Sequence, residues 1–108
     1  MKDIQFIGRS LESIRDFPNA AKREAGYQLD RVQHGLDPID WKPMSSIGPV
    51  VREIRINHDG QYRVIYIAKF EEAIYVLHAF QKKTQKTNKQ DIDAAKRALK
   101  TLEERETA

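Results

Sequence analysis

In its second half the chain alternates apolar and polar side chains with a period of two, a pattern typical of β-strands. We interpret Val50–Ile56, Gln61–Phe70 and Ala73–Lys82 as three strands. The connection Asn57–Gly60 contains Asp-Gly, which is a strong hairpin signal, and Glu71–Glu72 forms a second turn. Consecutive strands joined by such short turns predict an antiparallel meander.

Elsewhere the apolar residues recur at helical spacing. A short helix is predicted to begin at Ser10, and a second one runs from about Pro18 to His34, with Gly35 suited to end it. A third helix is predicted after Thr87-Asn-Lys-Gln90, which resembles a capping box. Its apolar face carries Ile92, Ala95, Leu99 and Leu102, and residues 103–108 are expected to fray.

Two segments complete the chain. Residues 3–7 read as a short first strand. Residues 37–49 contain three prolines and read as an irregular loop. Trp41 is expected to anchor this loop on the core, and the alternative is that its ring stacks on a base. The order is β-α-α-β-β-β-α. We therefore predict one α+β domain spanning residues 1–108, with a single core and helices on one face of a small antiparallel sheet.

The composition excludes several kinds of chemistry. The chain has no cysteine, which excludes disulfides, thiolate chemistry and the usual structural zinc sites. No glycine-rich phosphate loop, nucleotide-binding fingerprint or metal-ligand spacing is present, so neither metal nor cofactor is expected. No apolar stretch has the length of a membrane span or the form of a signal peptide, and we expect a cytoplasmic protein.

The basic excess belongs to one part of the sequence. Residues 50–89 contain eight Lys or Arg and four Asp or Glu, a net +4, which leaves −1 for the rest of a chain whose total is +3. A solvated sheet edge that keeps the protein soluble would explain this, and so would a surface that binds a polyanion.

The meander favours the second explanation. Its topology predicts that Arg55, Arg63 and the pair Lys82 and Lys83 meet at one edge of the sheet. Arg63 alternates with apolar residues, so its guanidinium is expected to be a partly buried donor fork suited to phosphate, with Glu53 or Asp59 as alternative partners. Lysines crowded by other cations have lowered pKa values and can act as bases.

Such a cluster is sufficient for RNA cleavage, because the 2′-hydroxyl is its own nucleophile and neighbouring cations stabilise charge on the phosphate. A strand histidine, His78, is a candidate acid or base, although core packing is the alternative. The catalytic candidates are Arg63, Lys83, Lys82 and His78. The candidates for binding RNA or phosphate are Arg52, Arg55, Lys86, Lys89 and His58.

Two stretches resemble a known family. Gly60-Gln-Tyr-Arg-Val-Ile-Tyr66 and Ala73-Ile-Tyr-Val-Leu-His-Ala-Phe-Gln-Lys-Lys-Thr-Gln-Lys-Thr87 are similar to the phage-derived, HigB-like branch of the RelE/ParE toxin superfamily. The resemblance implies a RelE-like fold and the toxin of a type II toxin–antitoxin pair. Such a toxin would bind the ribosome and cut mRNA without a metal, by attack of the 2′-hydroxyl on the adjacent phosphate. The implied partner is an antitoxin, typically a helix-turn-helix DNA-binding protein.

The resemblance also implies roles for particular residues. Arg63 matches the strand arginine that contacts the scissile phosphate, and Lys83 matches a basic position after the last strand, with Lys82 beside it. Arg52 and Arg55 stand near basic positions of the first meander strand. The best-studied relatives have a tyrosine beyond the last strand where this chain has Lys86-Thr-Asn-Lys89, which leaves the base unassigned.

Three functions therefore remain open. The first is a ribosome-dependent mRNA endonuclease, for which Arg63→Ala is expected to relieve growth arrest while leaving the fold intact. The second is a non-enzymatic inhibitor on the same fold, like the relatives that poison DNA gyrase. The third is an inactive phage-derived protein that binds RNA or another protein.

Overall fold

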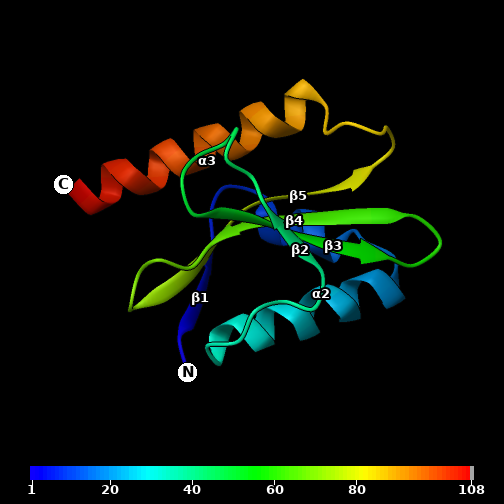
Figure 1. Cartoon of the computed structure of the whole chain (residues 1–108), viewed down its shortest axis with the longest axis horizontal. Helices are drawn as coiled ribbons and strands as arrows, with labels where there is room; N and C mark the ends of the chain where they lie inside the picture. Colours follow the sequence, from blue (N-terminus) through cyan, green and yellow to red (C-terminus); the bar gives the residue numbers. More distant parts are fainter. Residues whose placement is uncertain (108) are drawn as a thin grey trace.

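Five strands form one sheet in the order β1-β5-β4-β3-β2, and three helices pack on it (Figure 1). The computed structural model describes residues 1–107, and side chains for residues 1–105. The strands are β1 (Asp3–Phe6), β2 (Trp41–Pro43), β3 (Val51–Asn57), β4 (Gln61–Ile67) and β5 (Ala73–Lys82). The helices are α1 (Ser10–Arg15), α2 (Asn19–Gln33) and α3 (Lys89–Thr107). This arrangement confirms the α+β class.

The predicted meander is present, with β3, β4 and β5 antiparallel to one another. Its first hairpin closes with Asn57 opposite Gln61. Within that turn Asp59 has φ +51° and Gly60 has φ +150°, conformations that Asp tolerates and glycine adopts without strain. The Asp-Gly signal thus corresponds to the backbone that the turn requires.

The sheet is larger than predicted, and it is mixed. Trp41–Pro43, expected to be irregular, pairs antiparallel with β3 as an edge strand. Proline is compatible with an edge strand, where its missing N–H faces away from the ladder. At the other edge β1 runs parallel to β5, with Asp3 opposite Ala73 and Phe6 opposite Val76, so the expected purely antiparallel sheet was wrong.

Helices cover both faces of the sheet, where one face was expected (Figure 1). Neighbouring β4 residues pack into different clusters: Val64 lies in the cluster with α1 and α2, and Ile65 lies in the cluster with α3. Strands β4 and β5 are accordingly buried on both sides along most of their length. Their near-continuous apolar runs are typical of strands covered on both faces. The expected single core is therefore two layers, one on each side of the sheet.

The helix ends agree in part with the sequence. Helix α2 begins after Pro18 and is followed by Gly35 at φ +83°, as predicted. Helix α3 is capped by Asn88 rather than by Thr87, because the Asn88 Oδ1 accepts from the Asp91 N–H at 2.9 Å. Residues 103–107, expected to fray, belong to α3, and Ala108 lies outside the described residues.

No helix within residues 1–107 combines the length and the apolar character that crossing a membrane demands.

Candidate functional site

The strand register brings the predicted cations together. Arg55 lies directly opposite Arg63, and Arg63 lies opposite Phe80. Lys82 lies opposite Gln61 at the end of the same strand pair. Paired residues point to the same face of a sheet, and so do residues two apart on one strand. Arg55, Arg63 and Lys82 therefore share the α3 face, at the end nearest the β3–β4 turn.

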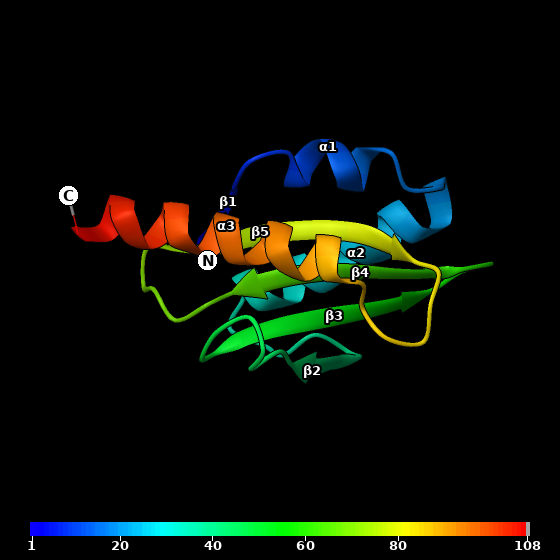
Figure 2. The same ribbon diagram turned by 90° about the horizontal axis from the view of Figure 1, so that it is seen from above.

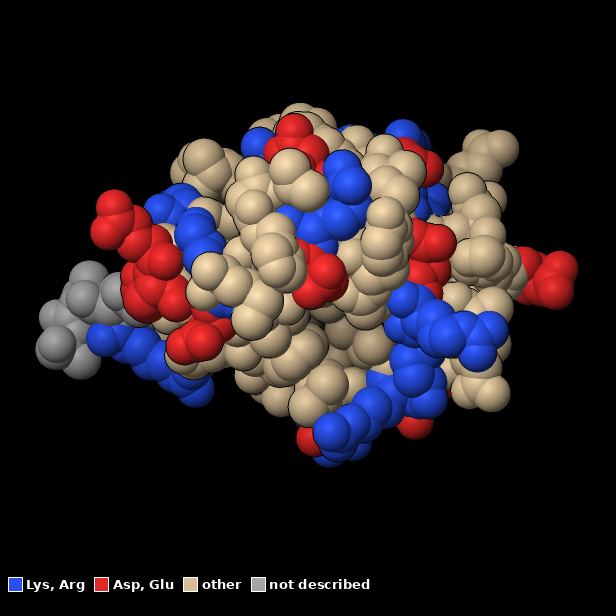
Figure 3. Space-filling view, turned by 90° about the horizontal axis from the view of Figure 1, so that it is seen from below, with Lys and Arg blue, Asp and Glu red and all other residues tan. Residues whose placement is uncertain are grey.

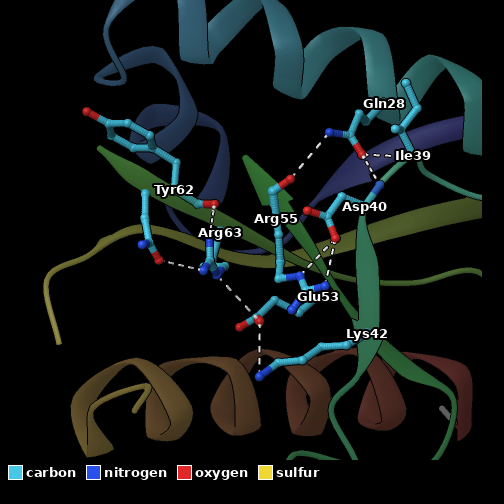
Figure 4. A network of polar contacts seen from close by, with 9 residues as sticks. Gln28, Ile39, Asp40, Lys42, Glu53, Arg55, Tyr62 and Arg63 are labelled. Carbon is cyan, nitrogen blue, oxygen red and sulfur yellow. Dashed lines mark hydrogen bonds and ion pairs between the residues drawn. The ribbon is translucent and has the colours of Figure 1, made fainter. Parts of the chain in front are cut away.

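The Arg63 guanidinium is buried and already occupied. Its side chain is 6% exposed. Its Nη1 donates to the carbonyl oxygen of Tyr62 at 3.0 Å, and its Nη2 donates to Oε1 of Gln61 at 2.9 Å (Figure 4). Its Nε lies 3.6 Å from Oε1 of Glu53. The expected fork open to a phosphate is therefore closed within the chain, and Glu53, not Asp59, is the acidic partner.

Glu53 is a fully buried carboxylate on the middle of β3. Within the described residues neither of its oxygens accepts a hydrogen bond. Its compensation is electrostatic: Nε of Arg63 lies 3.6 Å from Oε1, and Nζ of Lys42 lies 3.8 Å from the same atom. Burial lowers the pKa of Arg63, and the Glu53 carboxylate offsets part of that effect. The ion pair between Glu53 and Arg63 therefore holds the guanidinium inside the sheet, away from solvent.

Arg55 is held by the segment that precedes β2. Its Nη2 and Nε lie 2.8 and 2.9 Å from Oδ1 of Asp40. Asp40 is itself held by Gln28 of α2, whose Oε1 accepts from the N–H groups of Ile39 and Asp40 at 3.1 and 3.4 Å (Figure 4). Sequence reasoning missed Gln28. The sequence signal that could have identified Gln28 is a polar residue at a position on the apolar face of a helix, and in the structure this side chain is only 2% exposed.

A cavity of about 690 Å³ opens beside this cluster, at the ends of β4 and β5. It is lined by Gly60, Gln61, Gln81, Lys82, Lys83, Thr84 and Gln85. We call it the lysine cavity. Its lining offers two ammonium groups and three side-chain amides, with no Asp or Glu. Such a lining suits an anion.

The electrostatics of this cavity act on Lys82. Burial and the neighbouring cations Arg63 and Lys42 lower the pKa of Lys82, while Glu53 acts in the opposite direction. The expectation that crowding lowers a lysine pKa here is confirmed for Lys82. Lys83 follows the strand and is exposed in the same lining.

Two predicted residues lie elsewhere. Arg52 lies opposite Tyr66, which belongs to the α2 side of the sheet. Its guanidinium stands 4.0 Å from the Trp41 ring centroid and donates to Oδ1 of Asp37 at 2.9 Å, so one face of that ring is already covered. His58, in the β3–β4 turn, lies 3.7 Å from the Glu24 carboxylate of α2. The structure does not bring either residue to the lysine cavity.

The remaining candidates do not line the lysine cavity. His78 hydrogen bonds Oδ1 of Asp91 through Nε2 at 2.7 Å and stacks on Phe80 with ring centroids 5.4 Å apart. Its side chain, 20% exposed, thus joins β5 to the first turn of α3. Lys86 lies in the β5–α3 loop and Lys89 begins α3, and both are exposed. Within residues 1–105, no three His, Asp or Glu side chains are grouped as metal ligands.

Comparison with known proteins identifies the family. The family described as phage derived protein Gp49-like (DUF891) matches residues 12–100. The fold is similar to that of a mutant of the E. coli toxin RelE in the free state, with 14% sequence identity and a TM-score of 0.64, covering 94% of this chain and 97% of that one. A search of curated protein sequences gives no match. The chain belongs to the phage-derived Gp49-like family, and it has the fold of the toxin RelE.

Proposed function

We propose that this chain is the toxin of a type II toxin–antitoxin pair and that it cleaves mRNA on the ribosome. The observation that supports this best is the acid-free lysine cavity beside Arg63, at the end of the sheet on a RelE fold. Two lysines and a nearby buried arginine are the charges that binding a phosphodiester requires.

In the proposed reaction the RNA supplies its own nucleophile. The 2′-oxygen bonds to the adjacent phosphorus as the bond from phosphorus to the 5′-oxygen breaks. The departing 5′-oxygen takes a proton from water, which leaves a 2′,3′-cyclic phosphate and a 5′-hydroxyl end. Lys83 holds the phosphate, and Lys82, whose lowered pKa makes it a better base, accepts the proton of the 2′-hydroxyl. Arg63 stabilises the added negative charge once Gln61 has moved aside.

The partners proposed for this function are the ribosome, its mRNA and a cognate antitoxin. A net basic segment of the chain favours binding to the phosphates of ribosomal RNA. The antitoxin is proposed to be a small helix-turn-helix DNA-binding protein encoded beside the toxin, and the pair is proposed to act in the cytoplasm.

The test is primer extension on an mRNA in a translating extract. The native chain is expected to give discrete cleavage ends, and Lys82→Ala with Lys83→Ala is expected to slow cleavage about a hundredfold. The matched control, Lys96→Ala with Lys100→Ala, removes the same charge from the exposed face of α3, outside the lysine cavity, and should cleave normally. Unbroken RNA with the native chain would contradict the endonuclease, and equal losses in both variants would contradict the cavity.

Arg63→Ala is a poor test, because its effect on folding is not neutral. Removing this guanidinium leaves the buried Glu53 carboxylate without its nearest cation, a kind of change that costs about 3–5 kcal/mol. We therefore now expect Arg63→Ala to destabilise the fold, in place of the neutral effect on folding that the sequence suggests. Arg63→Lys keeps the charge near Glu53 and removes the two-pronged donor, which makes it the better variant.

The internal contacts of Arg63 favour a second candidate, a toxin that binds its target without cutting it. In the present arrangement the donors of Arg63 are engaged by Gln61, Tyr62 and Glu53, so the arginine is unavailable to a phosphate unless Gln61 moves. Growth arrest by the native chain with intact mRNA in the same cells would favour this inhibitor over the endonuclease.

A further inference from the structure

A second basic cavity lies between α1 and the C-terminal part of α3. Both helices pack on β5 (Figure 2). The cavity measures about 580 Å³, and we call it the α1–α3 groove. It is lined by Ile7, Gly8, Arg9, Ser10, Ser13, Leu77, His78, Ala94, Arg97, Ala98, Thr101 and Arg105. It shares no lining residue with the lysine cavity.

The charges of this groove are uncompensated. Arg9, Arg97 and Arg105 are exposed, and the lining contains no Asp or Glu. Within residues 1–105 the structure records no hydrogen bond or ion pair from any of these three guanidinium groups. By contrast, Arg52 and Arg55 on the sheet are each paired with an aspartate. Three unpaired guanidinium groups around one cavity attract a partner of negative charge.

The base of the groove is apolar. Ile7 and Leu77 are each 3% exposed and Ala98 is 8% exposed. Several other lining residues are small, namely Gly8 before α1, Ser10 and Ser13 on α1, and Ala94 on α3, so a partner backbone can approach closely. A surface with an apolar base and a cationic rim fits a peptide segment that has one apolar and one acidic face.

The same features argue against RNA as the occupant. An apolar base gives nothing to a phosphate backbone, whereas it does bury the apolar face of a peptide.

We propose that the α1–α3 groove is the docking site for an acidic, amphipathic segment of the antitoxin, on a surface separate from the lysine cavity. This inference rests on the proposed function, because the antitoxin is the partner which that function supplies. The arginine rim steers and orients the acidic face of the segment, and the groove base buries its apolar face.

The test measures binding of the protein encoded in the neighbouring reading frame to the full-length chain, by titration calorimetry. The groove variant carries Arg9→Glu, Arg97→Glu and Arg105→Glu. The matched control carries Arg15→Glu, Lys96→Glu and Lys100→Glu, the same reversals on or beside the same two helices but outside the lining. We expect the groove variant to bind about tenfold more weakly or worse, and the control to bind like the native chain.

Three results would overturn the proposal. In the first, the native chain, the groove variant and the control bind the partner equally; in the second, the native chain does not bind it. In the third, the groove variant binds the partner normally but associates more weakly with ribosomes. The last result would assign the groove to RNA. If the charge reversals lower the melting temperature, the corresponding Arg→Gln variants replace them, with the same expectation. Because calorimetry does not read cleavage, failure of the endonuclease appears separately, as intact RNA in the primer-extension assay.

Discussion

At the scale of single residues, the central feature is that Arg63 is positioned and blocked by its own neighbours. Glu53 compensates its charge from within the sheet, and Gln61 accepts from its outer nitrogen at 2.9 Å. Of these two partners only Gln61 is exposed, and it also lines the lysine cavity. A phosphate oxygen can therefore take the place of the Gln61 oxygen while the contact with Glu53 persists.

This arrangement predicts opposite effects for two substitutions at one position. Gln61→Ala frees a donor of Arg63 and is expected to raise RNA affinity and cleavage about threefold, because the hydrogen bond from Arg63 to Gln61 no longer has to be broken. Gln61→Glu places a carboxylate against the guanidinium and is expected to lower both by more than about tenfold. Filter binding and primer extension measure the two effects.

Gln85→Ala is the control for this pair, because it removes an amide from the same cavity without a recorded contact to Arg63. If Gln61→Ala and Gln85→Ala behave alike, Gln61 does not gate the arginine.

At the scale of elements, the position of Lys83 depends on how α3 is docked. Lys83 lies in the loop between β5 and α3. One end of that loop is fixed by Lys82 in the strand pair with Gln61. The other end is fixed by the bond between His78 and Asp91, at 2.7 Å. The histidine considered as a catalytic candidate therefore has a clear structural role in holding the helix that follows the site.

Asp91→Ala is expected to loosen this junction. It removes the contact with His78 and a favourable carboxylate from the first turn of α3, and it should lower the free energy of unfolding by about 1–2 kcal/mol. Urea unfolding measures that loss, and amide hydrogen exchange should become faster across residues 83–92.

The control is Asp93→Ala, which changes the same charge two residues along the helix without a recorded partner. Equal destabilisation by both substitutions would mean that helix charge, and not the contact with His78, accounts for the effect.

At the scale of the whole molecule, basic groups cluster in two places along β5: in the lysine cavity at its C-terminal end, and in the α1–α3 groove beside its middle. The side that carries α2 is different in character. Lys and Arg lie there among Asp and Glu over much of the surface, with one larger basic group at its edge (Figure 3). The mixed-charge surface over α2 is thus separate from the acid-free lysine cavity.

This separation predicts a salt dependence that is local to one face. The logarithm of the affinity for a single-stranded RNA is expected to fall linearly with the logarithm of the salt concentration. Lys83→Ala should reduce the magnitude of that slope by about 0.7, the contribution of one phosphate contact. Fluorescence anisotropy at several salt concentrations gives the slope.

Arg23→Ala, an exposed cation on α2, is the matched control and should leave the slope unchanged. An equal reduction in both variants would show that RNA binding is diffuse over the surface and does not belong to the lysine cavity.

Much of this structure could be predicted from the sequence, for a physical reason. The period-two pattern and the Asp-Gly turn are local signals, and they define β3, β4 and β5 to within a few residues. Because antiparallel strands joined by a tight turn have a fixed register, the meeting of Arg55, Arg63 and Lys82 also follows from the sequence. Three-residue β2 is too short to show a period, and so it was missed.

The sequence by itself therefore determined every element except β2, the order of those elements and which cations share one end of the meander. Only the tertiary structure decided that β1 runs parallel to β5, that helices cover both faces, and that Glu53 and Gln61 occupy the donors of Arg63. These are contacts between segments distant in sequence, or between side chains whose burial depends on such contacts, and no local periodicity records them. For this protein, local pattern predicts which charges gather, and long-range packing decides which of them remain free.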